Sequence, residues 1–160
     1  MVSASKAKKP VITQSKINHK SPVLHPLARF VTEETAAFLF NLKPEEIYRI
    51  DCWRHMVYVH GKGVSKFVSY ADFPPIIGVE IPTTQDFVRW RKRWRSHWKK
   101  YQAPSFWTHF YQQQFQKADC ETNLLTMGKL VAIIKPLLPQ TAVEQLRETY
   151  KQQQYYWANF

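Results

Sequence analysis

The sequence predicts an α+β fold that is mostly helical, with a small N-terminal unit followed by a unit of four helices. Hydrophobic residues make up 44% of the 160 residues and aromatic residues 15%, which is enough for a sizeable core. A glycine-centred hairpin pattern lies in the first half, and apolar residues recur at helical spacing in the second. We therefore divide the chain into a basic arm (residues 1–24), a small α+β unit (25–82) and a helical unit (83–160).

The arm, residues 1–24, is rich in Ser, Lys and Pro and has no apolar period. This composition is typical of a mobile segment. Residues 1–30 carry six positive charges and no acid. The arm is therefore either a plain leader or a segment that holds phosphates, and the sequence favours neither.

The α+β unit is expected to begin with a short helix that ends near Asn41. Thr32 suits the N-cap, and two glutamates follow in the first turn, where the helix dipole favours acids. Pro44 then suits the first position of another helix, but residues 47–55 fit either a helix or a strand. Residues 56–70 predict a hairpin, because β-favouring residues flank the turn at 61–63.

Four helices are expected in the helical unit. Thr83 and Asp86 have the spacing of a capping box, so the first helix should start near residue 84 and end near 102, before Pro104. Two further helices are predicted over residues 105–117 and 121–135, and Gly128 in the second favours close helix packing. Thr141 and Glu144 predict a capping box for a last helix that runs to about residue 153.

The first of these helices contains the most basic stretch of the chain, Arg89 to Tyr101. Seven of the twelve residues from Arg89 to Lys100 are Lys or Arg, three are Trp, and none is acidic. On a helix the tryptophans form one stripe, which we expect to pack against the other helices rather than stack on bases. The cations spread over the other faces and are the candidate phosphate ligands: Arg89, Arg91, Lys92, Arg93, Arg95, Lys99 and Lys100.

Residues 31–73 resemble the winged helix-turn-helix domains of excisionase-like and MerR-like DNA-binding proteins. The matching positions are, in chain order, Thr32, Ala36, Ala37, Tyr48, Arg49, Gly61, Lys62, Gly63, Lys66 and Asp72. The resemblance implies a recognition helix that offers Tyr48, Arg49 and Arg54 to the major groove. It also implies a wing, carrying Lys62 and Lys66, whose tip approaches a phosphate or the minor groove.

The net charge of +11 lies mainly in the arm and the basic helix, which predicts a polyanionic or acidic partner. The expected function is nucleic-acid binding, with a DNA-binding transcriptional regulator favoured over an RNA-binding protein. The alternatives are an assembly or adaptor protein that binds an acidic protein or ribosomal RNA through the same helix, and a helix that lies on an anionic membrane surface. A homodimer would suit paired DNA half-sites.

The sequence predicts no enzyme, no cofactor and no metal site. The carboxylates and the six histidines are scattered, without the spacing of a metal site or a nucleophile motif. Cys52 and Cys120 lie far apart, which predicts two reduced thiols in a cytoplasmic protein. No run of 18 apolar residues exists, so no membrane-spanning helix is expected.

Overall fold

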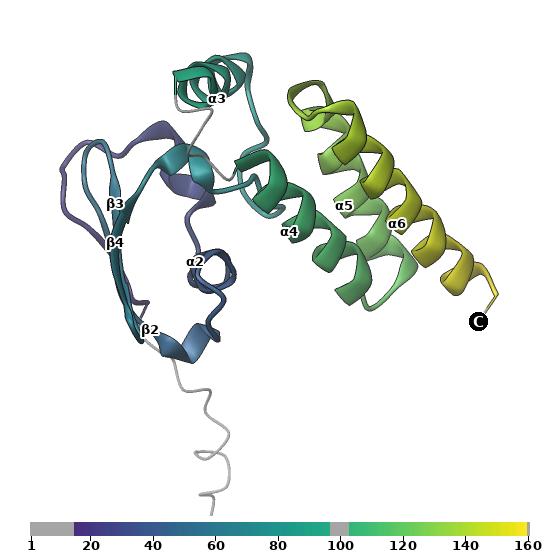
Figure 1. Cartoon of the computed structure of the whole chain (residues 1–160), viewed down its shortest axis with the longest axis horizontal. Helices are drawn as coiled ribbons and strands as arrows, with labels where there is room; N and C mark the ends of the chain where they lie inside the picture. The colour runs from purple at the N-terminus through teal and green to yellow at the C-terminus, as the bar shows by residue number, and fades with distance from the viewer. Residues whose placement is uncertain (1–14, 97–102, 160) are drawn as a thin grey trace, which may run out of the picture.

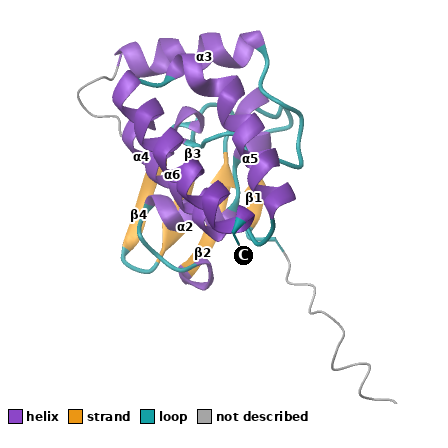
Figure 2. Cartoon of the chain, turned by 90° about the vertical axis from the view of Figure 1, so that its right-hand side faces the viewer, coloured by secondary structure: helices purple, strands orange, loops and turns teal. Residues whose placement is uncertain are grey.

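The computed structural model describes residues 15–96 and 103–159. A four-stranded mixed sheet with short helices comes first, and four helices follow, which confirms the predicted α+β class (Figure 1). All the helices lie on one side of the sheet or beyond its end. Figure 2, viewed from the helical side, shows them in front of the strands. One face of the sheet therefore carries the core, and the other is not covered by any of these helices.

The strands follow one another across the sheet in chain order. β1 (Ile17–His19) runs parallel to β2 (Ile47–Cys52), and β3 (Val57–Gly61) and β4 (Val64–Val68) complete an antiparallel meander. The β3–β4 pair confirms the predicted hairpin. β1 and β4 are thus the two edges of the sheet.

β1 corrects the prediction that the whole of residues 1–24 is a mobile arm. Ile17 pairs with Ile50, and the Lys20 backbone N–H donates to the Cys52 carbonyl at 2.9 Å. The Lys16 N–H donates to the Glu33 carboxylate at 2.9 Å. These bonds satisfy the otherwise unpaired edge of β2, a non-local effect that the composition of the arm does not reveal. Residues 1–14 lie outside the described part of the chain.

Residues 47–55 fitted either a helix or a strand, and the structure shows a strand over residues 47–52. A 3₁₀ turn, η2 (Pro44–Glu46), is followed directly by β2, which has a neighbour on both sides. Ile47, Ile50 and Cys52 are buried on the core face. The spacing of Ile47 and Ile50 also suited a helix, but pairing with β3 decides the outcome. A strand therefore occupies the place where the winged helix-turn-helix resemblance implies a recognition helix.

Short helices cover the core face of the sheet. They are η1 (Pro26–Phe30), α2 (Glu33–Leu39) and η3 (Tyr70–Asp72). Thr32 caps α2 as predicted, because its side-chain oxygen accepts a hydrogen bond from the Thr35 N–H at 3.0 Å. Residues 73–83 connect η3 to the helical unit without regular secondary structure and include a turn at Gly78.

The helical unit consists of α3 (Thr84–Ser96), α4 (Ala103–Lys117), α5 (Glu121–Ile134) and α6 (Gln140–Ala158), with a 3₁₀ turn, η4 (Lys135–Leu137), before α6. The capping box of α3 is confirmed by its reciprocal bonds, from the Asp86 N–H to Thr83 Oγ1 and from the Thr83 N–H to Asp86 Oδ2. The capping box predicted for α6 is wrong. Pro139 is the N-cap of α6, and Glu144 accepts a hydrogen bond from Gln140 instead.

One hydrophobic core runs through both units. Phe30 of η1 packs against Trp90 of α3 with ring centroids 6.0 Å apart, and Phe38 of α2 packs against Phe106 of α4 at 5.5 Å. Full burial of such a ring contributes about 1.5–3 kcal/mol to the free energy of unfolding. The α+β unit and the helical unit therefore depend on each other for their packing.

Candidate nucleic-acid interface

The rotation of α3 about its axis is fixed by its tryptophan stripe. Trp90 is 0% exposed and Trp94 is 7% exposed. Trp90 meets Trp107 of α4 edge to face, and Trp94 Nε1 donates to the Ala71 carbonyl oxygen at 3.3 Å. The prediction that the stripe packs inside the protein is confirmed for Trp90 and Trp94, so these two rings are not available to stack on bases, while Trp98 lies outside the described residues.

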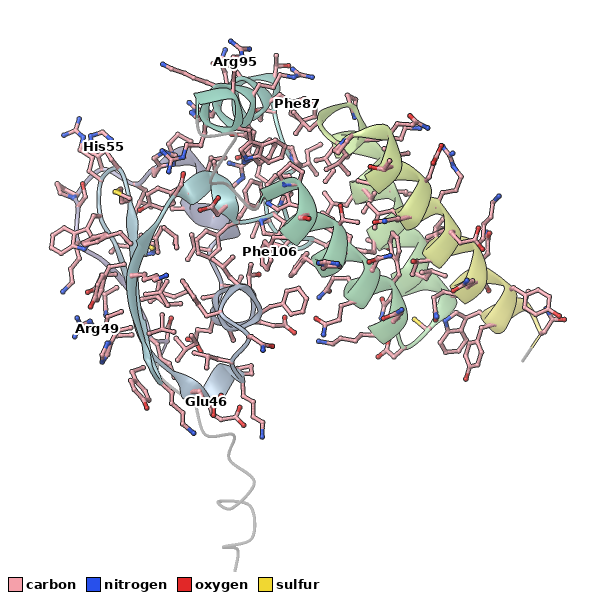
Figure 3. All side chains as sticks on the ribbon, viewed as in Figure 1. Glu46, Arg49, His55, Phe87, Arg95 and Phe106 are labelled. Atoms are coloured by element: carbon pink, nitrogen blue, oxygen red, sulfur yellow. The ribbon has the colours of Figure 1, made fainter. Side chains whose placement is uncertain are left out.

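Because the tryptophans point inward, the cations of α3 point outward. Arg91, Lys92 and Arg95 are exposed and Arg93 is half-buried. In Figure 3 the side chain of Arg95 points away from the rest of the molecule. The Arg91 guanidinium lies 5.4 Å from the centroid of the Phe87 ring, which orients it along the helix surface. The exposed cations at 91, 92 and 95 therefore face solvent, and Arg93 lies further round the helix, where it lines a cleft.

Asp86 anchors the start of this helix. It is the one acidic residue of α3, and its buried carboxylate accepts hydrogen bonds from Arg29 of η1, from the Thr83 N–H and from Arg89. Burial alone would raise the pKa of Asp86, but the bonds from Arg29 and Thr83 outweigh it and lower the pKa. The carboxylate is thus charged, and it ties η1 to the N-terminal turn of α3.

A cleft of about 350 Å³ lies between α3 and the β2–β3 connection. Its lining includes the cations Arg89, Lys92 and Arg93, with His25 and His55 opposite. The other lining residues are Leu27, Ser69, Tyr70 and Ala71. The cleft is therefore rich in hydrogen-bond donors and positive charge, which is the chemistry that holds a phosphate.

His25 is held neutral in this cleft. Its ring stacks on Tyr70 with centroids 4.1 Å apart, and its Nδ1 accepts a hydrogen bond from the Leu27 N–H at 3.0 Å. Burial, then the nearby Arg89 and His55, lower the pKa of His25 to about 4, although Asp86 acts in the opposite direction. The positive charge of the cleft at neutral pH therefore comes from its arginines and lysine.

The structure does not bring all the predicted ligands together. Arg54 lies on the exposed β2–β3 connection, next to His55 of the cleft. Lys62 lies at the turn between β3 and β4, where its Nζ is 3.6 Å from a carboxylate oxygen of Glu46. Figure 3 places Glu46 at the opposite end of the sheet from His55 and Arg95, so Lys62 is remote from α3. Lys99 and Lys100 lie outside the described residues.

Lys66 and Arg49 lie on opposite faces of the sheet. Lys66 of the edge strand β4 is directly opposite Val59 of β3. Its side chain therefore points to the same side of the sheet as the buried Val59, the core face. Charges that point inward on an edge strand oppose pairing with another sheet, which is the simplest role for Lys66. Arg49 points away from the helices (Figure 3), and its Nε donates to Asp51 Oδ2 at 3.0 Å.

Sequence reasoning missed the aromatic residues on the face of the sheet away from the helices. We call this surface the open sheet face and define it by the residues Asn18, Tyr48, Arg49, Asp51, Tyr58, His60, Ser65 and Phe67. Tyr48 is 55% exposed and Phe67 is 58% exposed. In β3, buried valines alternate with Tyr58 and His60, and this pattern could have indicated a sheet with a second, exposed face. Recognising that face would also have required the knowledge that residues 47–52 form a strand.

Comparison with known proteins identifies no relative: no family model, no curated protein and no solved structure matches this chain. Within residues 15–96 and 103–159, no group of three or more His, Cys, Asp or Glu side chains is placed to hold a metal ion. No helix in the described part of the chain is long and apolar enough to cross a membrane. The function must therefore be argued from the geometry of these surfaces.

Proposed function

We propose that this protein binds nucleic acid, and that the outer surface of α3 and the adjoining cleft hold the phosphates. The observation that carries the proposal is the orientation of α3. Its aromatic residues Trp90 and Trp94 are buried, and this leaves Arg91, Lys92 and Arg95 exposed beside a cleft that Arg89, Lys92 and Arg93 line. Dense positive charge on one surface is the electrostatic footprint of a phosphate-binding protein.

The same geometry disfavours a membrane-surface role for α3. A helix that lies on a bilayer inserts an apolar face into the headgroup region. The apolar stripe of α3 is instead engaged with Phe30, Trp107 and the Ala71 carbonyl. An adaptor that binds an acidic protein would use the same cations, and the experiment below separates it from a nucleic-acid-binding protein.

A role as a transcriptional regulator at duplex DNA is the more specific form of the proposal. Phosphate contacts from α3 alone would give affinity without sequence preference. Any base readout would have to come from elsewhere in the chain, since β2 takes the place of a recognition helix. Both described cysteines are free, in keeping with the cytoplasmic location that such a role requires.

The test compares two variants with the same change in net charge. In the first, Arg91, Lys92, Arg93 and Arg95 are replaced by Gln; in the control, the exposed cations Lys129, Lys135, Arg147 and Lys151 of η4, α5 and α6 are replaced by Gln. Affinity for duplex DNA is measured by fluorescence anisotropy over a range of salt concentrations. Each lost phosphate contact should reduce the magnitude of the slope of log K against log salt by about 0.9, so the loss of four contacts in the first variant should reduce it by about 3.6.

The control variant should keep most of the slope, because its charges lie on other helices. Equal losses in the two variants would show a general effect of net charge and contradict the assignment to α3. If the wild-type protein binds neither duplex nor single-stranded nucleic acid at low salt, the proposed function is wrong and an acidic protein becomes the candidate partner.

A further inference from the structure

We infer that the open sheet face is a stacking platform for single-stranded nucleic acid, with the bases on the sheet and the phosphates directed to the cations around it. This inference rests on the proposed function and names the form of nucleic acid. It is carried by the placement of three aromatic side chains, Tyr48, Tyr58 and Phe67, on an uncovered face.

An irregularity in β2 builds this platform. Ile47 pairs with Gly61 and Arg49 pairs with His60, so two steps along β2 correspond to one step along β3, and Tyr48 is the extra residue. Such bulges change the direction of side chains. Tyr48 is exposed beside the ring of His60, at 5.4 Å between centroids, while its neighbour Arg49 also points outward (Figure 3).

The pairing of the strands places the other aromatic residues, Tyr58 and Phe67, on the same face of the sheet. Asp51, Tyr58 and Phe67 are directly opposite one another on β2, β3 and β4, so they share one face. The Tyr58 and Phe67 rings are 5.0 Å apart, and the Arg49 guanidinium lies 5.7 Å from the Tyr58 centroid. Aromatic rings and an arginine side by side are the surfaces on which unpaired bases stack.

The open sheet face presents no unpaired negative charge to a polyanion. Its one carboxylate, Asp51, is 4% exposed and is held by Arg49 and by Asn18 Nδ2 at 3.3 Å. The Arg49 side chain remains 51% exposed. At the β2–β3 end of the sheet, Arg54 and the cleft with Arg89 add positive charge. A polyanion that covers the face thus meets no exposed carboxylate of this face, and it reaches further cations at the β2–β3 end of the sheet.

The exposed rings allow a test that leaves the fold intact. Tyr48→Ala combined with Phe67→Ala removes two rings that are more than half exposed, and Tyr155→Ala, on the 71% exposed Tyr155 of α6, is the matched control. The probes are labelled oligothymidylate and oligouridylate of about 16 nucleotides, together with a DNA duplex of the same length. Circular dichroism and the thermal midpoint verify that each variant is folded.

The double variant should bind the single strands at least about tenfold more weakly, because stacking on each ring contributes substantially to affinity. Its affinity for the duplex should stay within about twofold of the wild-type value, since stacked pairs offer no free base face. The Tyr155→Ala control should match the wild type on every probe. A preference for one of the two single strands distinguishes DNA from RNA as the source of the bases.

Two results would overturn the platform while leaving phosphate binding by α3 in place. They are single-strand affinity that is unchanged in the double variant, and equal losses on the single strands and the duplex. If the wild-type protein binds none of the three probes, the proposed function fails together with the platform.

Discussion

Trp90 of α3 and Trp107 of α4 meet edge to face, with ring centroids 5.2 Å apart and an interplanar angle of 88°. Both indoles are fully buried, and Trp107 Nε1 also donates to the Asp72 carbonyl at 3.1 Å. This pair joins α3 to α4, and the bond to Asp72 joins the Trp107 ring to the end of η3. The cations of α3 are therefore held by the core rather than by a free helix.

Trp90→Ala should lower the free energy of unfolding by about 3–5 kcal/mol, since it leaves a cavity among aromatic rings. Urea denaturation measures the loss. Trp90→Phe keeps a ring in the site, so it should remain folded and bind nucleic acid as the wild type does. A folded Trp90→Phe protein with reduced affinity would instead show that bases contact this indole.

Asp86→Asn should destabilise the protein by about 2–3 kcal/mol, because the buried arginine contact loses its charged partner. The matched control is Glu34→Gln, which breaks the exposed ion pair between Lys117 Nζ and Glu34 at 2.9 Å. That change should cost less than about 1 kcal/mol. Chemical denaturation of both variants at neutral pH checks the difference, and similar losses would contradict the anchoring role of Asp86.

The stability of the protein should increase with pH between about 4 and 6.5. The lowered pKa of His25, about 4 against an ordinary 6.5, means that the unfolded chain binds a proton there in this interval while the folded protein does not. The contribution of His25 is therefore fully present above pH 6.5 and is lost progressively as the pH falls towards 4.

Thermal midpoints measured across this interval test the effect. His25→Asn retains a side-chain acceptor for the Leu27 N–H but removes the titrating ring. The slope of the midpoint against pH should become shallower in this variant, whatever its overall stability. An unchanged slope would assign the pH dependence to groups other than His25.

Gly128→Ala should destabilise the protein, although alanine is the better helix former by about 1 kcal/mol. A β-carbon at Gly128 would lie 2.6 Å from Cε1 of Tyr150, so the tyrosine ring that packs there would have to move. In a Tyr150→Ala background the same change should become stabilising. A double-mutant cycle measures this reversal, and additive effects would show that the two residues do not interact.

The sequence predicted local features well because local chemistry determines them. The Thr32 cap, the Thr83–Asp86 box and the glycine-bounded turn before Val64 each depend on a few neighbouring residues. The burial of Trp90 followed from helical spacing alone. By contrast, residues 47–52 suited two periodicities, and only pairing with strands on both sides makes them β2.

The candidate site was predictable in part for the same reason. A run of cations on one helix can be found by inspection, and α3 carries it as expected. The open sheet face could not be found in this way, because Tyr48 and Phe67 are 19 positions apart and share a face only through the register of three strands. The mispredicted α6 cap shows a further limit, since the helix begins after Pro139, which makes no side-chain cap bond, and not at the Thr141–Glu144 pattern.

The core that is shared between the two halves of the chain has an evolutionary consequence. Phe30 and Phe38 lie against Trp90 and Phe106, so cutting the chain near residue 82 would expose large aromatic surfaces on both fragments. Neither half is a module that can be transplanted by itself.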